Sequence, residues 1–354
     1  MPLVTFNNTN QTFYPSVKKA VETYFKTNNI RPTGDWRLYL KTIIGTCVAL
    51  TAYSFLLFGS YGVFGGVLLS VLFGLALAFI AFNTMHDACH DAYSRKKWVN
   101  KLMGYSMNAL GSNAFLWKIK HNVLHHTYTN VEGIDDDIAR HPILRFCSSQ
   151  KRFSYHRYQF IYMFFLYSLM TFIWMIVFDF QKYFTRKINN TPINKITTKE
   201  HLIFWVSKLG YIIFYIAIPV VFVGWKAWFI GFMLMHVTLG LSLSIIFQLA
   251  HVVEKTSFES VGETAKVIET AWAEHEVKTT ANFAPDNKIV SFFCGGLNFQ
   301  IEHHLFPRVS HIHYPAISKI VREQCAFFGL EYNYYPSMFE AVKSHVRVMK
   351  KLGS

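Results

Sequence analysis

Long runs of apolar residues alternate with polar, basic segments along this chain of 354 residues. Each run approaches the ~20 residues that an α-helix needs to cross the hydrocarbon core of a bilayer. The runs lie at about 40–58, 61–82, 160–178, 204–223 and 228–249. This pattern predicts an all-α integral membrane protein.

Short connections join four of these runs into pairs. Only Gly59 and Ser60 separate the first two runs, and residues 224–227 separate the last two. A connection this short stays at the membrane surface, so each pair is expected to form a transmembrane hairpin. The middle run, 160–178, has no such partner.

Three tight clusters hold seven of the sixteen histidines. Residues four apart share one face of an α-helix, so the paired histidines in the first two clusters can converge on a ligand. Imidazole binds zinc, copper, iron and nickel. A structural zinc takes four ligands, usually including thiolates, but the five cysteines are scattered. So many histidines therefore indicate two metal ions close together. The clusters are His86-x-x-x-His90, His121-x-x-x-His125-His126 and His303-His304.

A shared metal site requires all three clusters to lie on one side of the membrane. Three crossings between His126 and His303 would place the third cluster on the opposite side. The 160–178 run has basic residues at both ends, and positive charge marks the cytoplasmic side. We therefore expect this run to lie in the membrane interface. That leaves four transmembrane helices, with the metal site and both termini cytoplasmic.

These expectations describe one domain with five consecutive parts. A short interfacial helix is also expected at 103–117. The net charge of +14 is attributed to cytoplasmic loops facing lipid headgroups, because the basic residues flank apolar runs. Nucleic-acid binding would need a separate basic patch, and none is expected. The parts are an N-terminal segment (1–38), a hairpin (40–82), a cytoplasmic and interfacial segment (83–203), a second hairpin (204–249) and a cytoplasmic helical cap (250–354).

The three histidine clusters, in this order, resemble those of the membrane fatty-acid desaturases. The similarity covers roughly residues 35–345 and includes residues 295–299 before the third cluster and Leu305-Phe306-Pro307 after it. It implies two iron ions that use O2 and two external electrons to remove two hydrogens from a CoA- or lipid-linked acyl chain. The product would carry a cis double bond. The implied iron ligands are the seven clustered histidines and His251, which directly follows the fifth run: His86, His90, His121, His125, His126, His251, His303 and His304.

Gln300 opens the third cluster where many desaturases have histidine. This variant resembles the front-end group, which inserts a Δ5 or Δ6 bond on the carboxyl side of an existing one. The His-Pro-Gly-Gly motif of a fused cytochrome b5 is not in the sequence. Electrons are therefore expected from a separate ferredoxin, or from cytochrome b5 with its reductase.

Two other functions are alternatives to desaturation. A membrane di-iron hydroxylase of fatty acids or alkanes shares the histidine-cluster chemistry and is the alternative enzyme. A transporter would need ionisable residues within the spans, and apart from His236 these are nearly absent.

Polar residues near the clusters are candidates to orient the ligands. A metal-bound histidine usually donates its second ring N–H to a carboxylate or carbonyl. We expect this role for at least one residue of the Asp135-Asp136-Asp137 run. The further candidates are Asp87, Asp91, His275, Asn298 and Gln300.

Overall fold

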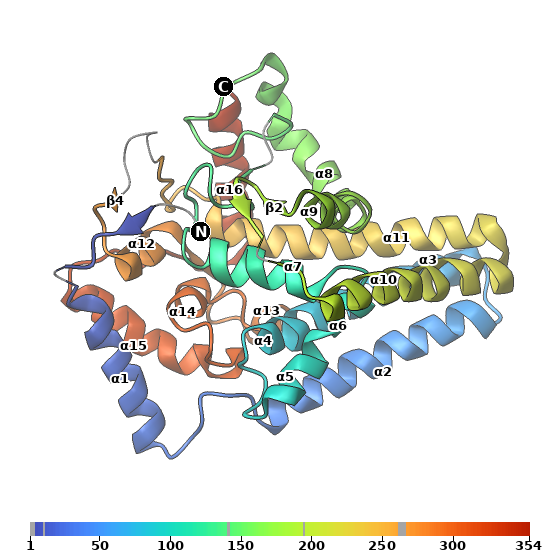
Figure 1. The fold of residues 1–354 in the computed structure, drawn as a ribbon, viewed down its shortest axis with the longest axis horizontal. Coiled ribbons are helices and arrows are strands. Elements are labelled where there is room, and N and C mark those ends of the chain that lie inside the picture. The colour runs from blue at the N-terminus through green and yellow to red at the C-terminus, as the bar shows by residue number, and fades with distance from the viewer. Residues whose placement is uncertain (1–3, 10, 140–141, 194, 261–266) are drawn as a thin grey trace.

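The computed structural model confirms a mainly helical protein with very little sheet (Figure 1). It describes residues 4–9, 11–139, 142–193, 195–260 and 267–354. Within these ranges the sheet consists of three pairs of two-residue strands. These are β1 (Thr5–Phe6) with β4 (Val267–Ile268), β2 (Lys187–Ile188) with β3 (Thr191–Pro192), and β5 (Asn282–Phe283) with β6 (Tyr334–Tyr335).

Two hairpins of long apolar helices form the extended part of the molecule (Figure 1). The first joins α2 (Trp36–Phe58) to α3 (Val63–Ile80), which continues through a π-helical turn, η1 (Ala81–Met85), into α4 (His86–Cys89). The second runs through α10 (Thr198–Ile212), η5 (Ile213–Ala217) and α11 (Ile218–His251). Gly224 (φ 77°, ψ 158°) breaks this helix and reverses the chain, which glycine can do because it lacks a Cβ. Both predicted hairpins are confirmed.

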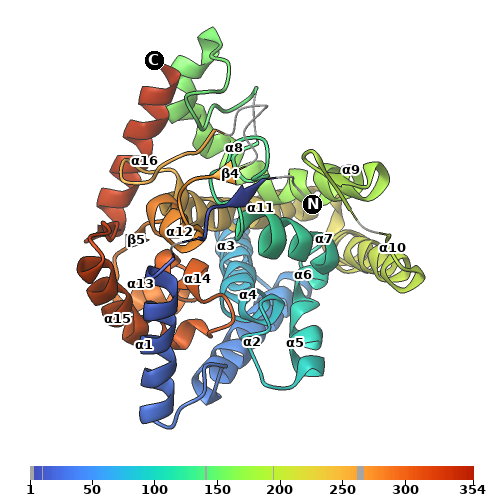
Figure 2. The ribbon, with the colours of Figure 1, turned by 60° about the vertical axis from the view of Figure 1, so that its left-hand side comes forward.

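The middle apolar run lies across the hairpins rather than along them. It comprises η3 (Ser154–Tyr158), α8 (Gln159–Ile173), η4 (Trp174–Phe178) and α9 (Asp179–Thr185). By length and composition, Ser154–Thr185 is one of four segments capable of spanning a membrane, with Trp36–Phe58, Val63–Cys89 and Thr198–His251. Figures 1 and 2 both show α8 steeply inclined to α11. The interfacial placement of 160–178 stays a prediction, and this inclination supports it.

The cap consists of shorter amphipathic helices at one end of the hairpins (Figure 2). The helix expected at 103–117 is wrong as a single element, because the chain breaks at Gly111 (φ 94°), whose backbone packs against the Tyr211 ring. The cap and interfacial helices are α1 (Phe13–Thr27), α5 (Lys97–Gly104), α6 (Ser106–Ala109), α7 (Ala114–Lys118), η2 (Ile119–His125), α12 (Trp272–Thr279), α13 (Lys288–Phe293), α14 (Gln300–Leu305), η6 (His311–His313), α15 (Tyr314–Phe327) and α16 (Met338–Gly353).

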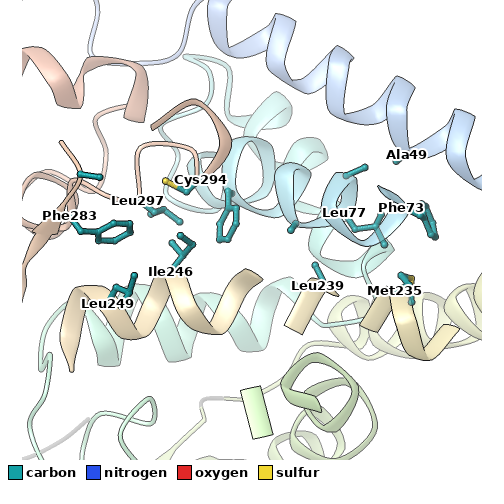
Figure 3. Close-up of a cluster of buried hydrophobic side chains, with 14 of the residues drawn as sticks. Ala49, Phe73, Leu77, Met235, Leu239, Ile246, Leu249, Phe283, Cys294 and Leu297 are labelled. Atoms are coloured by element: carbon teal, nitrogen blue, oxygen red, sulfur yellow. The ribbon is translucent and has the colours of Figure 1, made fainter. Parts of the chain in front are cut away.

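One apolar core continues from the hairpins into the cap. Figure 3 shows Phe73, Leu77 and Met235 within the helical bundle and Phe283 and Leu297 at its cap end. Removing this apolar surface from water or lipid headgroups fixes the cap against the ends of α3 and α11. The positions of the histidines on these helix ends are therefore set by close packing.

A buried ion pair ties α9 to α10. The Lys208 ammonium donates to an Asp179 carboxylate oxygen at 2.8 Å and to the carbonyls of Gly111 and Met175. The expectation that His236 is nearly alone among ionisable residues in the spans is therefore incomplete, since Lys208 belongs to the 204–223 run. Its charge is compensated within the protein, as a buried charge requires.

Candidate metal centre

Eight histidines converge where the hairpins meet the cap, and each is at most 5% exposed. They come from four segments that are far apart in the sequence. His86 and His90 lie at the end of the long helix α3–α4, His121, His125 and His126 in η2 and directly after it, His251 at the end of α11, and His303 and His304 in α14.

The ring nitrogens of these histidines form two adjoining groups. Within each group, the ligand atoms lie within 4.8 Å of one another. His126 lies between the groups, with its ring centroid 4.5 Å from that of His303 and 4.3 Å from that of His304. The first group is His86, His90, His121 and His303, and the second is His125, His251 and His304.

The second sequence cluster lies on a π-helical turn, η2, and at its end. The backbone N–H of His126 donates to the carbonyl of His121 at 3.0 Å, five residues earlier. An ordinary α-helix would place His121 and His125 above one another on one face. In η2 the two rings still stack, with centroids 5.2 Å apart, and their ligand atoms form a further group with Asp137, so His121 of the first group adjoins His125 of the second. Single π-helical turns are frequent at functional sites.

The arrangement of the nitrogens fits metal ions. Among the described residues, the Nε2 atoms of five site histidines are buried without a hydrogen-bond partner; they belong to His90, His125, His251, His303 and His304. The Nε2 of His121 lies 3.3 Å from that of both His86 and His126. Buried polar atoms without partners are costly. Cations between these nitrogens would remove that cost, so the residues present fit a pair of metal ions.

The opposite ring nitrogens are held by the surrounding protein. Nδ1 of His125 lies 3.1 Å from an Asp135 oxygen, and Nδ1 of His304 lies 2.7 Å from a Glu276 oxygen. Nδ1 of His303 meets the Tyr314 hydroxyl at 3.1 Å, and Nδ1 of His251 meets the Thr279 carbonyl at 3.4 Å. Such partners fix the ring orientation and tautomer of metal-binding histidines, leaving Nε2 free to bind.

Electrostatics keep most of these histidines neutral. Burial first, and then the neighbouring imidazoles, lower the pKa of His121, His126, His303 and His304 well below 6.5. Neutral imidazole is the form that binds metal. Burial alone would lower the pKa of His125, but Asp135 and Asp137 outweigh it and raise that pKa.

The carboxylate beside His304 belongs to a buried pair. Burial raises the pKa of Glu276 well above 4.5, while burial and nearby imidazoles lower that of His304. The pair is therefore neutral as a whole. A proton on Nδ1 of His304 satisfies the Glu276 oxygen and leaves the Nε2 lone pair facing the centre.

The residues proposed from the sequence to orient the ligands lie in different places. Asp135 contacts His125 directly, as described above. Asp87 instead accepts from the Ser310 hydroxyl at 2.6 Å and lies 3.0 Å from Nδ1 of His311. Asp91 is exposed in a turn with φ 59°, so the structure does not bring it into the centre.

The other three candidates lie beside the centre and support its backbone. His275 is buried with Nε2 2.8 Å from the carbonyl of Thr129. The side-chain amide of Asn298 donates to the Ala284 carbonyl and to the Ser291 hydroxyl. The amide of Gln300 donates to the Leu297 carbonyl at 2.8 Å.

Three important contacts were not found from the sequence. Glu276 directly follows the candidate His275, and the helical periodicity of 272–279 was the one sequence feature that could have indicated that its side chain is buried. Tyr314 lies eleven residues beyond His303, and the Thr279 contact uses a backbone carbonyl; neither has a sequence signature. His236 is separate from the centre, and its Nε2 lies within hydrogen-bonding distance, 2.7 Å, of the Tyr211 hydroxyl inside the bundle.

An elongated apolar cavity of about 300 Å³ adjoins the histidines. Leu239, Leu243, Phe247 and His251 line it at intervals of four residues along α11. Twelve residues of helix span ~18 Å, so the cavity extends well away from the centre. Trp117, Met85 and side chains of α8 form other walls. Its shape and lining suit a hydrocarbon chain.

Comparisons with known proteins agree with this geometry. A family model described as fatty acid desaturase matches residues 61–336. The sn-1 linoleoyl-lipid 6-desaturase of Arthrospira platensis is 34% identical over 342 residues, covering 96% of this chain and 92% of the relative. The relative of the same description in Synechocystis sp. is 34% identical over 347 residues, covering 95% and 94%. The acyl-lipid (8-3)-desaturase of Physcomitrium patens is 35% identical over 348 residues, covering 97% and 72%.

Proposed function

This chain belongs to the fatty acid desaturase family and is a membrane oxidoreductase, and we propose that it is an oxygen-dependent di-iron acyl-lipid desaturase. The observation that carries the proposal is the set of unpartnered, buried Nε2 atoms beside an apolar cavity. The donor set is imidazole, which suits iron. Eight ligands in two adjoining groups match two ions better than one.

The proposed ligands are the eight histidines His86, His90, His121, His125, His126, His251, His303 and His304. When bound, the iron ions would supply O2 activation and the capacity to remove two hydrogens from an acyl chain. The chain's own residues do the rest. The α11 face with Leu243 and Phe247 holds the acyl chain in the cavity and excludes water. Asp135, Glu276, Tyr314 and the Thr279 carbonyl hold the rings in position.

The proposed substrate is an acyl chain carried by a membrane lipid, with the new cis bond on the carboxyl side of an existing one. Support comes from relatives described as an sn-1 linoleoyl-lipid 6-desaturase and an acyl-lipid (8-3)-desaturase. A cavity that starts at the metal centre and runs along a membrane helix accepts a chain entering from the bilayer. Gln300 at the start of α14 is consistent with the front-end variant.

We further propose that the centre and both termini face the cytoplasm, and that electrons come from a separate ferredoxin or cytochrome b5. The α2–α3 and α10–α11 hairpins each return the chain to the cap side. The eight proposed ligands and the cap helices therefore lie on one side of the bundle. Basic residues flank Ser154–Thr185 at both ends, and positive charge favours the cytoplasm for the side of the bundle that holds the cap.

Expression in a host that supplies a dienoic acyl lipid tests the proposal. We expect a new polyunsaturated fatty acid in the lipid fraction by gas chromatography, with its double bond located by mass spectrometry. Product that is only hydroxylated would overturn desaturation in favour of the alternative enzyme.

A variant pair tests the ligands. His125→Ala is expected to lose bound iron and product while the protein is still made, because one ligand of a small set is removed. His201→Ala is the control, since His201 bonds Tyr183 away from the centre and should retain both. Iron is measured in the purified protein by mass spectrometry. Retained iron and activity in His125→Ala would overturn the ligand assignment.

A further inference from the structure

A basic pocket opens at the cap end of α2 and shares no lining residue with the apolar cavity. Its volume is about 1140 Å³. Among its described lining residues the one carboxylate is Asp35, and this is already paired with Arg37 at 2.9 Å. The pocket therefore carries a strong excess of positive charge. The cationic side chains are Lys26, Arg31, Arg37, Arg95 and Lys96, all exposed.

Backbone contacts hold this pocket in shape. The segment between α1 and α2 is fastened by the Ser310 N–H donating to the Pro32 carbonyl at 2.8 Å. The Gly34 N–H donates to the Ala92 carbonyl at 2.9 Å. A Cβ on Gly34 would lie 2.6 Å from the Tyr93 carbonyl oxygen, so the two segments pack very closely. The cations thus surround a preformed cavity, and binding would need little ordering of the backbone.

Large exposed apolar side chains lie close in sequence to the pocket residues, at the start of α2 and on α5. Trp36 is 69% exposed at the first position of α2, and Trp98 is 64% exposed on α5. Leu102, one turn after Trp98, is 54% exposed. Tryptophan is enriched at the membrane–water interface. The pocket therefore lies at headgroup depth, beside side chains that face lipid.

We propose that this pocket binds the anionic headgroup of a membrane lipid through its phosphate or sulfate. Arginine forks pair with such groups in bidentate fashion, and Arg31 and Arg95 approach the pocket from different segments. An acidic protein would also be attracted to the charge, but the concave shape and the neighbouring tryptophans favour a lipid. This site is independent of the proposed desaturase function and of the histidine centre.

The test measures lipid retained by the purified full chain. The protein is exchanged into micelles with equal amounts of phosphatidylcholine and phosphatidylglycerol, and bound lipid is counted by native mass spectrometry. The pocket variant is Arg31→Gln, Arg95→Gln and Lys96→Gln, which spares Arg37 because Asp35 and Arg37 begin α2. The control removes the same charge from the exposed face of α16 as Lys343→Gln, Lys350→Gln and Lys351→Gln.

We expect phosphatidylglycerol to be retained selectively, and the pocket variant to weaken this retention by ~10-fold or more, since each basic side chain near the surface contributes measurably. The control variant should match the original protein. Equal retention by the pocket variant would overturn the proposal. So would equal loss in both variants, which would indicate a general charge effect.

Two further arms separate other ligands. Inorganic phosphate is added at increasing concentration, and displacement by low phosphate would show a site for free phosphate instead of lipid. The soluble domain of cytochrome b5 is tested for binding to both variants. A pocket variant that retains lipid but loses cytochrome b5 binding would assign this surface to an acidic protein and overturn the lipid proposal.

Discussion

Replacing Glu276 should impair the metal centre although this residue is not a proposed ligand. One carboxylate oxygen of Glu276 lies 2.7 Å from Nδ1 of His304 and 2.8 Å from the Thr129 hydroxyl. Both Glu276 and His304 are 0% exposed, so bulk solvent does not reach this contact. In Glu276→Ala the His304 ring would lose the group that fixes its tautomer and orientation.

The size of the effect follows from the buried Nδ1–H of His304, which loses its acceptor at a cost of about 1–3 kcal/mol. At about 1.4 kcal/mol per factor of ten, this predicts a ~5- to 150-fold loss of metal affinity or activity. The Thr129 hydroxyl, 3.1 Å from Nδ1, can accept in place of Glu276 and favours the lower end. Glu276→Gln keeps an acceptor oxygen and should lose ~10-fold or less.

Iron content and product formation are measured together in purified protein under single-turnover conditions. Glu274→Gln, two residues earlier in α12 and half-buried, is the matched control and should behave as the original protein. The reasoning is refuted if Glu276→Ala retains both iron and rate. It is also refuted if Glu276→Gln is as defective as Glu276→Ala, because orientation through an acceptor would then not be the cause.

Three further predictions concern buried polar groups. Lys208→Met alone should destabilise the protein by about 3–5 kcal/mol, because it leaves Asp179 buried and unpaired. Adding Asp179→Leu should recover most of this stability. Thermal unfolding in detergent measures both variants, and a double variant whose loss of stability equals the sum of the two single losses would contradict the pairing. Asp87→Ala should lower the unfolding temperature, at a cost of about 3 kcal/mol, because it removes the partner of His311 and Ser310; unchanged unfolding would show that this contact is not stabilising. Burial raises the pKa of Glu302 from 4.5 to about 7. Between these two pH values folding takes up a proton on this carboxyl group, so the free energy of unfolding falls as the pH rises from 4.5 to 7. Glu302→Gln should therefore unfold with a weaker loss of stability over that range, and an unchanged pH slope would contradict the assignment.

Local features of the sequence predicted much of this protein. Apolar runs and their short connections predicted both hairpins, because hydrophobic length alone decides whether a helix can span a bilayer. The spacing of His86 and His90, and of His121 and His125, predicted metal binding. An imidazole side chain can bind a metal ion wherever the fold places it, so residue type alone supported this prediction.

The grouping of the histidines needed the tertiary structure. Helical spacing predicted that His121 and His125 share a face, and their rings do stack, but only the tertiary structure shows which histidines of the other clusters each of them meets. Hydrophobic periodicity does not show whether a backbone carbonyl accepts a hydrogen bond from the N–H four or five residues ahead. The expected helix at 103–117 failed for a similar reason, since Gly111 turns the chain where Tyr211 packs against it.

The orienting partners were equally hidden. Asp87 stands beside the proposed metal ligand His86 in sequence but contacts His311, 224 residues away. Glu276 orients His304 from a different helix. Sequence proximity selects neighbours along the chain, whereas hydrogen bonding requires atoms within about 3 Å in space.

The sequence by itself thus determined the apolar helices long enough to span a membrane, the candidate metal-binding histidines and the resemblance to desaturases. These depend on residue type and on distances along one helix. Only the tertiary structure decided which nitrogens face one another, which carboxylates hold them, and where the apolar cavity and the basic pocket open. Those depend on how separate helices pack, and packing is set by the whole core rather than by any one segment.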